Sequence, residues 1–350
     1  MKVLVTGADG YIGSVLCPLL MERGHDVAGL DCGFYRDGWL YDAGGRSPPV
    51  TTKDIREVDV ADVAGFDAVV HLAELSNDPL GEHDQRLTYE INHRGSVSLA
   101  ATCRAAGVGR FIYASSCSVY GAGSGAVKTE ESEPNPQTAY ARCKVLVERD
   151  VGALADERFT PVFLRNATAF GASPRMRFDV VLNNLAGFAW TTHEVKMTSD
   201  GTPWRPLVHV EDISRAVMFS LEAPREAVHG QIFNVGGDEQ NYRIREIAEI
   251  VVAAFPGCTT TFGPNSGDTR SYQVSFAKIR RHVPAFGCDW TAERGANQLR
   301  QIFERIGMSR VTFEDRAYTR LKQLKHLQDT RQIDKDFYFQ TTRRARAVPA

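Results

Sequence analysis

The sequence predicts an α/β fold, in which a doubly wound parallel sheet is followed by a smaller C-terminal lobe. Three observations support this class. Short apolar strands alternate with helical stretches over the first 165 residues, a glycine-rich turn joins the first strand to the first helix, and polar side chains follow several predicted strands. Alternation of this kind is typical of a parallel sheet with helices on both faces, and such sheets bind ligands beyond the carboxyl ends of their strands.

The first strand and helix enclose the glycine-rich turn. A strand is predicted over residues 2–6 and a helix over 14–23, with Gly7, Gly10 and Gly13 between them. The first glycine permits a tight turn, the second lets the backbone approach a pyrophosphate, and the third lets the helix pack closely on the strand. The helix N-terminus would hold the pyrophosphate. This segment therefore predicts a dinucleotide-binding site.

The second strand indicates which dinucleotide is bound. It is predicted over residues 26–31 and ends in Asp31. A carboxylate there can accept hydrogen bonds from the adenosine ribose and would repel a 2′-phosphate, so NAD is favoured over NADP. Arg36 is the one nearby residue that argues for NADP.

Further strands are predicted over 67–73, 110–116 and 159–165, with helices over 84–106 and 140–154. After Arg165 the pattern becomes irregular. We expect three parts, namely a dinucleotide-binding domain over 1–165 plus about 207–235, a substrate-binding lobe over about 166–206 and 236–305, and a C-terminal extension over 306–350.

The C-terminal extension carries its own pattern. Leu321, Leu324 and Leu327 predict an amphipathic helix docked on the body, and the basic end over 341–350 is expected to be disordered.

A tyrosine and a lysine mark the predicted chemistry. Tyr140 and Lys144 lie four residues apart, on one face of a helix, so the ammonium can lower the pKa of the phenol. A free phenol titrates near pH ~10, and a neutral-pH base needs a shift of roughly three units. Ser116 ends a buried strand and can hold the substrate oxygen that the tyrosine deprotonates. The alternative is a half-exposed surface pair, since this spacing also occurs by chance.

Composition narrows the class of protein. Hydrophobic residues make up 43% of the chain, charged residues 24%, and the net charge is -2, which gives no reason to expect a nucleic-acid or membrane partner. The seven cysteines are scattered without a C-x-x-C pair, which argues against a metal site and for a reducing compartment. The chain goes straight into a strand, so no signal peptide is expected. A cytoplasmic protein is predicted.

Motifs in this order resemble the extended short-chain dehydrogenase/reductases of the NAD-dependent nucleotide-sugar epimerase/dehydratase family. The resemblance covers about residues 1–305 and implies a Rossmann-type doubly wound parallel sheet with a smaller C-terminal substrate-binding lobe. It rests on residues 6–13, Asp31, Asp59 with Val60, residues 71–73, Asn92, residues 115–121, Tyr140 with Lys144, Arg205 before 209–212, and residues 233–236.

The resemblance implies a role for each of these positions. Tyr140 would be the base, Lys144 its pKa partner and a ribose ligand, and Ser116 the hydroxyl that orients the substrate. NAD would contact, besides Tyr140 and Lys144, Gly7, Gly10, Tyr11, Ile12, Gly13, Asp31, Asp59, Val60, Leu72, Ala73 and Asn92, with Asp59 and Val60 around the adenine. The nucleotide sugar would contact Ser116, Ser118, Thr168, Arg177, Asn183, Arg205 and Arg270, and with less support Arg175.

One departure from the family narrows the reaction. The 4,6-dehydratases place an acidic pair directly after the hydroxyl residue, where this chain has Cys117 and Ser118, so water elimination is not expected. What remains is oxidation at a sugar carbon, and we expect an NAD-dependent nucleotide-sugar 4-epimerase that works through a transient 4-keto sugar.

Several alternatives stay open. One is a 4-dehydrogenase or 4-ketoreductase on the same substrate class, and another is a non-catalytic NAD-binding regulator. Residues 173–177 also resemble a bacterial heptose-nucleotide branch of the family. By the same resemblance, a homodimer is expected through the helices over 84–106 and 140–154.

Overall fold

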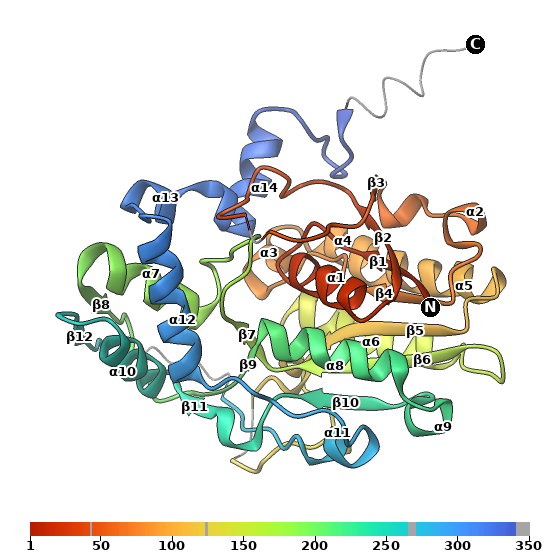
Figure 1. Ribbon diagram of the computed structural model, residues 1–350. Coiled ribbons are helices and arrows are strands. Elements are labelled where there is room, and N and C mark those ends of the chain that lie inside the picture. Colours follow the sequence, from red (N-terminus) through yellow and green to blue (C-terminus); the bar gives the residue numbers. More distant parts are fainter. Residues whose placement is uncertain (43, 123–124, 265–270, 341–350) are drawn as a thin grey trace.

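The computed structural model describes all of the chain except residues 43, 123–124, 265–270 and 341–350 (Figure 1). Its centre is a parallel sheet with the strand order β10-β6-β5-β4-β1-β2-β3. The seven strands are β1 (Lys2–Thr6), β2 (Asp26–Asp31), β3 (Val50–Thr52), β4 (Ala68–His71), β5 (Arg110–Ser116), β6 (Thr160–Asn166) and β10 (Ile232–Val235). The predicted α/β class is confirmed.

Side chains of one strand contribute to two hydrophobic cores, because successive side chains point to opposite faces of the sheet. Val3 and Val5 of β1 pack with α1 (Gly13–Glu22) and α8 (Val210–Glu222) on one face. Leu4 packs on the other face, with α6 (Ala139–Gly152) and α5 (Ser96–Ala105). Helices therefore cover both faces, as the doubly wound pattern requires (Figure 1).

The stretch predicted as one helix over 84–106 is helical but not uniform. It consists of α4 (Gln85–Thr88), the π-helical η2 (Tyr89–Gly95) and α5. A π-helical turn widens the backbone and is frequent at functional sites. Here it carries Asn92, which the sequence placed near the cofactor.

The second lobe holds two small sheets, one in the order β11-β9-β7 and one in the order β12-β8. Its strands are β7 (Thr168–Phe170), β8 (Glu194–Lys196), β9 (Trp204–His209), β11 (Asn241–Arg243) and β12 (Thr259–Thr261). A third hydrophobic core joins α7 (Val181–Thr192), α10 (Ile244–Ala254) and α12 (Ala292–Arg305). The chain returns to the main sheet through α8 and β10.

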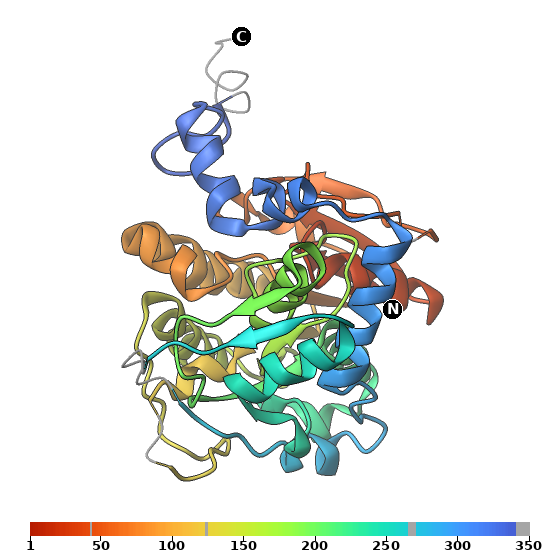
Figure 2. The same ribbon diagram turned by 90° about the vertical axis from the view of Figure 1, so that its left-hand side faces the viewer.

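The C-terminal extension crosses back to the first half of the chain. It contains α13 (Arg310–Glu314), η5 (Arg316–Tyr318) and α14 (Arg320–Asp329), and both views show α14 against the segments around β2 and β3 (Figures 1 and 2). Leu324 and Leu327 are buried in the same core as Leu4, so the predicted docked helix is confirmed. The end over 341–350 lies outside the described residues.

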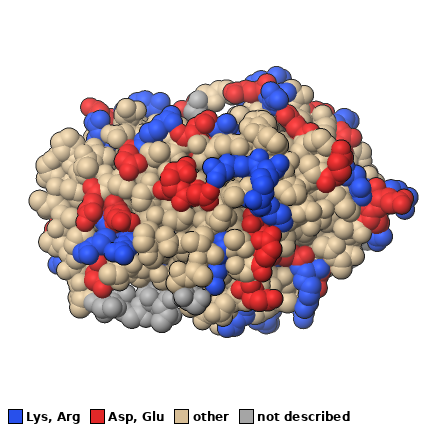
Figure 3. Space-filling view, turned by 90° about the horizontal axis from the view of Figure 1, so that it is seen from below, with Lys and Arg blue, Asp and Glu red and all other residues tan. Residues whose placement is uncertain are grey.

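Short helices complete the chain. They are η1 (Ile55–Glu57), α2 (Val60–Val63), α3 (Asp78–His83), η3 (Cys117–Tyr120), α9 (Arg225–Val228), η4 (Asp238–Gln240) and α11 (Ala277–His282). On the face shown in Figure 3, acidic and basic side chains are interspersed, in agreement with the small net charge. Within the described part of the chain, no helix has the length and apolarity needed to cross a membrane.

Candidate active site

Two positions of the turn between β1 and α1 have no room for a side chain. Gly7 has φ +74°, and a Cβ atom on it would lie 2.9 Å from the backbone nitrogen of Ala73. A Cβ atom on Gly13 would lie 2.4 Å from the carbonyl oxygen of Gly7. No side chain caps the N-terminus of α1, where the helix dipole favours an anion. These features fit the pyrophosphate of a dinucleotide.

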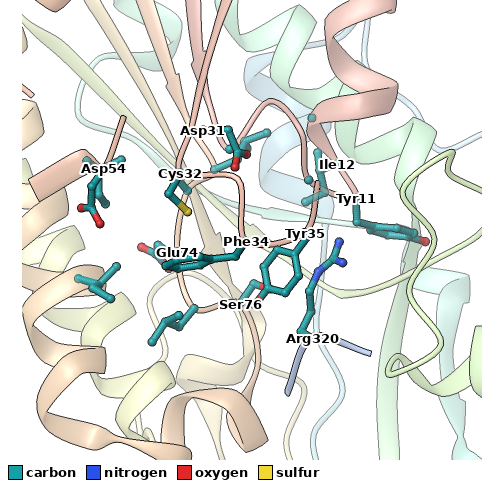
Figure 4. Close-up of a pocket in the computed structure, with 18 of the residues that line it drawn as sticks. Tyr11, Ile12, Asp31, Cys32, Phe34, Tyr35, Asp54, Glu74, Ser76 and Arg320 are labelled. Atoms are coloured by element: carbon teal, nitrogen blue, oxygen red, sulfur yellow. The ribbon is translucent and has the colours of Figure 1, made fainter. Parts of the chain in front are cut away.

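A groove runs from this turn along the carboxyl ends of β1, β2 and β4. It brings together many of the predicted cofactor residues, namely Gly7, Gly10, Tyr11, Ile12, Gly13, Asp31, Leu72 and Ala73 (Figure 4). The sequence missed several other lining residues, among them Cys32, Phe34, Tyr35, Lys53, Glu74, Ser76 and Arg320. Within the described residues, no cluster of three or more His, Cys, Asp or Glu could hold a metal ion.

Asp31 is fixed at the adenosine end of the groove. Its Oδ1 accepts a hydrogen bond of 2.7 Å from the Gly33 N–H, and its Oδ2 accepts one of 3.2 Å from the Asp9 N–H. Burial raises the pKa of this carboxyl above its ordinary value. Arg36 does not line the groove, and its guanidinium donates to the Thr52 hydroxyl at 2.6 Å instead. This arrangement fits NAD.

The residues expected around the adenine lie at the edge of the groove. Asp59 caps α2 with a side chain that is 67% exposed and lies 3.7 Å from the Lys53 ammonium of the groove lining, and Val60 is 49% exposed. Their contact with the adenine stays a prediction. Asp54 and Ile55 line the groove itself. Because β3 already ends at Thr52, the residues that follow it directly reach the groove, and the start of α2 lies beyond them.

Asn92 supports the groove indirectly, through hydrogen bonds to the backbone of Leu75. Its amide oxygen accepts a hydrogen bond from the Leu75 N–H, and its amide nitrogen donates to the Leu75 carbonyl oxygen, both at 2.9 Å. Its side chain is fully buried and does not line the groove. Asn92 therefore holds in place the loop that carries Glu74 to Ser76.

The predicted catalytic side chains meet at the carboxyl end of β5. Ser116 ends that strand, and the first two turns of α6 carry Tyr140 and Lys144. The Tyr140 and Ser116 hydroxyls are hydrogen-bonded, and the Lys144 ammonium lies 5.3 Å from the centroid of the Tyr140 ring. Lys144 also donates to the Ala114 carbonyl oxygen at 2.5 Å. The structure thus brings together the three groups that the sequence picked out.

Glu74 joins this group and was not predicted. Its Oε2 lies 2.6 Å from the Lys144 ammonium, and its Oε1 accepts a 2.6 Å hydrogen bond from the Tyr113 hydroxyl. The Glu74 side chain is only 3% exposed. It directly follows the motif 71–73 near the end of β4, and a charged residue at such a strand end is the signal that could have pointed to it.

The pKa of Tyr140 differs from the expectation. Burial raises it above its ordinary value, the Lys144 ammonium lowers it, and the carboxylates of Glu74 and Asp78 raise it again. The net direction is upward, because the effect of burial is larger than that of Lys144, and the two carboxylates add to it. In this structure the lysine alone therefore does not produce a base at neutral pH.

Replacing Glu74 with Gln is expected to move the acidic limb of the kcat/KM pH profile to lower pH, by about one unit. The substitution removes a negative charge that disfavours the Tyr140 phenolate, so the phenol loses its proton at lower pH. The matched control is Glu226→Gln on exposed α9, which should leave the profile unchanged. An acidic limb that stays in place, or moves to higher pH, would contradict this role of Glu74.

A second hollow lies beside the N-terminus of α6. Ser118 and Arg205, both predicted substrate ligands, line it together with Asp78, Gly121, Gln137, Thr138, Ala141 and Tyr272. The Arg205 guanidinium lies 5.7 Å from the centroid of the Tyr272 ring. Thr168 is half-buried at the start of β7 and does not line this hollow, and Arg270 lies outside the described residues.

The remaining predicted substrate residues lie elsewhere. Arg177 lines the cofactor groove and is paired with Asp179 at 2.8 Å. Asn183 is fully buried, where it accepts from the Gly171 N–H at 2.9 Å and donates to the Tyr11 hydroxyl at 3.2 Å. We therefore correct the expectation for Asn183, since its amide is used to hold the Gly171 backbone and the Tyr11 hydroxyl in place.

Arg175 has a structural position as well. Its guanidinium donates to the carbonyl oxygens of Tyr35 and Arg36 and lies over the Trp39 ring, 4.2 Å from the ring centroid. This side chain is almost fully buried. It anchors the loop after β2, and it lines neither the groove nor the second hollow.

Comparison with known proteins agrees with this geometry. The family model described as NAD dependent epimerase/dehydratase family matches residues 3–236. The chain belongs to this family. Its cofactor is NAD, and it is an NAD-dependent enzyme. The resemblance seen in the sequence is confirmed.

Individual relatives align with about three quarters or more of this chain. It is 27% identical to UDP-glucose 4-epimerase of Corynebacterium glutamicum, over 92% of this chain and 99% of that protein. It is 28% identical to 2-alkyl-3-oxoalkanoate reductase of Stenotrophomonas maltophilia, over 73% of this chain and 76% of that protein. The solved structure of MoeE5 in complex with UDP-glucose and NAD has a TM-score of 0.75 and 26% identity, over 88% of this chain and all of the other.

Proposed function

We propose that this protein is an NAD-dependent nucleotide-diphosphate-sugar 4-epimerase that works through a transient 4-keto sugar. The observation that carries the proposal is the meeting of Ser116, Tyr140 and Lys144 between the NAD groove and a second hollow lined by Arg205. An arginine suits a substrate diphosphate because its planar fork makes two charge-assisted hydrogen bonds. Full-length similarity to a UDP-glucose 4-epimerase supports the same substrate class.

The side chains have the following roles in this proposal. NAD, when bound, supplies the hydride acceptor for the sugar carbon and can return the hydride. Tyr140 takes the proton of the sugar hydroxyl, and Ser116 holds the same oxygen by a hydrogen bond. Lys144 stabilises the phenolate. When the keto sugar is reduced again on its other face, Tyr140 gives the proton back to that oxygen.

The residues after Ser116 argue against water elimination. Cys117 is buried, its thiol donates to the Arg165 carbonyl oxygen at 3.1 Å, and burial raises its pKa well above the ordinary value. Ser118 is a hydroxyl residue at the second hollow. Neither side chain supplies the carboxylic acid that a dehydration step needs, so the keto sugar keeps all of its hydroxyl groups.

A second candidate is a dehydrogenase or ketoreductase that uses the same residues and lets the oxidised or reduced product leave. The similarity to a 2-alkyl-3-oxoalkanoate reductase supports this second candidate. We also propose that the protein forms a homodimer, paired through α6 and the helical segment from α4 to α5.

We further propose that the protein is cytoplasmic. All seven cysteines are free thiols, which supports a reducing compartment.

The test is proton NMR of the purified protein with NAD and a panel of UDP-, GDP-, dTDP- and CDP-sugars, with NADH absorbance followed in parallel. We expect a new C4 epimer to form without accumulation of NADH. A keto sugar formed in step with NADH would move the assignment to the dehydrogenase. If none of these sugars gave a product, the result would contradict a 4-epimerase activity on these substrates.

A further inference from the structure

The C-terminal extension brings an arginine into the cofactor groove. Arg320 is the first residue of α14, and it lines the groove together with Tyr11, Ile12 and Tyr35 (Figure 4). Its residue exposure is only 3%. None of the sequence motifs of the family includes this position, which lies beyond the matched residues 3–236.

The guanidinium of Arg320 forms no direct ion pair with the described residues, although the carboxylates of Asp179 and Asp31 lie near enough to raise its pKa. Its Nη2 is buried without a hydrogen-bond acceptor, and its guanidinium carbon lies 4.1 Å from the centroid of the Tyr35 ring. Burial lowers its pKa to about 10. A buried cation without a counter-ion is unfavourable, so an anion is the expected complement of this site.

The other cations in the groove differ in this respect. Arg177 is paired with Asp179 at 2.8 Å, and Lys53 is paired with Asp62 at 2.5 Å. Both are therefore neutralised by the protein itself. Among the groove-lining residues that the structure describes, this leaves Arg320 as the positive charge available to a ligand.

The position of the guanidinium identifies the anion. In Figure 4, Arg320 reaches past Tyr35 toward Tyr11 and Ile12, at the start of α1. That helix N-terminus has no side-chain cap and is where the glycine turn would place a pyrophosphate. We propose that Arg320 binds the pyrophosphate of the dinucleotide, so that the C-terminal extension completes the cofactor site.

The extension is anchored well enough to hold Arg320 in this position. The amide of Gln323 donates to the Phe34 carbonyl oxygen at 3.0 Å, and the Tyr318 hydroxyl donates to the Trp39 carbonyl oxygen at 3.1 Å. Farther along, the rings of Phe337 and Phe34 meet edge to face, with centroids 6.4 Å apart. The groove and the extension are therefore one packed unit, and the arginine is pre-organised for its ligand.

The test uses the full-length protein freed of bound nucleotide, with Arg320→Met as the variant. Calorimetric titration measures the affinity for NAD, for ADP-ribose and for adenosine, which lacks the pyrophosphate. We expect the variant to bind NAD and ADP-ribose roughly 10- to 100-fold more weakly and adenosine as wild type does. The decrease of NAD affinity with added salt should also be smaller. Arg310→Met, an exposed arginine of the same extension paired with Glu314, is the matched control and should bind all three normally.

The thermal unfolding temperature separates binding from a purely structural role. For Arg320→Met without nucleotide we expect no decrease, because an unpaired buried cation has been removed, but a smaller increase on addition of NAD. Unchanged NAD affinity would overturn the proposal. An equal loss for adenosine and NAD would also overturn it, since the contact would then not be to the pyrophosphate. Arg320→Lys keeps the charge and should recover part of the affinity.

Discussion

Replacing Tyr140 with Phe should lower kcat by about 10²- to 10⁴-fold, while the affinity for NAD stays close to that of the wild type. The substitution removes only the hydroxyl that bonds to Ser116 and leaves the ring that packs beside the Lys144 ammonium. The protein then has no group to accept the sugar proton. Product NMR measures the turnover, and calorimetric titration measures the affinity for NAD.

A second tyrosine variant serves as the control for that prediction. Tyr242 lies in the second lobe, where its hydroxyl donates to the Gln240 side chain at 3.1 Å, so Tyr242→Phe should keep full turnover. Near-normal turnover in Tyr140→Phe would exclude Tyr140 as the base. A parallel loss of NAD affinity would instead indicate a disturbed groove.

The second large effect concerns stability. Arg165→Met should lower the free energy of unfolding by about 3–5 kcal/mol, because it leaves the carboxylate of Glu148 buried without its partner. The two side chains are 4% and 5% exposed and joined by a 2.7 Å ion pair, and Ser115 donates to the same carboxylate at 2.5 Å. Urea unfolding at neutral pH measures the loss.

A double variant checks this explanation. Arg165→Met with Glu148→Leu removes both buried charges and should recover most of the loss at neutral pH. A double variant as unstable as Arg165→Met alone would contradict the explanation.

The sheet could be predicted from the sequence because its strands are continuous apolar runs that end at glycine or polar residues. The bounds of β1, β2 and β5 are those expected. The grouping of the proposed catalytic side chains was also predictable, since helix geometry places Tyr140 and Lys144 together and strand polarity places Ser116 at the ligand edge. These are local or topological rules, which a single sequence contains.

The positions that the sequence did not resolve have a different physical origin. The pairs Asp54-Ile55 and Asp59-Val60 each consist of an aspartate and a β-branched residue. Only the position at which β3 ends shows that the first pair lines the groove. An asparagine such as Asn183 can either bind a substrate or hold backbone groups in place. The residue type alone does not show which of these two roles it has. The amide of Asn183 is enclosed by Tyr11 and Gly171, which are distant in sequence.

The contacts of two charged residues became visible only in the tertiary structure. Glu74 meets Lys144 because β4 and α6 converge at one edge of the sheet. Arg320 reaches the groove because the chain returns from the second lobe and packs across the loop after β2. Neither contact has a spacing that a pattern can detect. Both alter the electrostatics of the site, Glu74 beside Tyr140 and Lys144, and Arg320 in the groove.

The central claim is that the sugar is oxidised at C4 and reduced again by the same NAD, with Tyr140 moving the proton. The most direct measurement is NMR of the epimerised product formed from a UDP-hexose deuterated at C4, in ordinary water. We predict that the product keeps its deuterium at C4, with no accumulation of NADH. Loss of the deuterium to solvent would contradict the account, because it would mean that C4 is inverted by proton exchange.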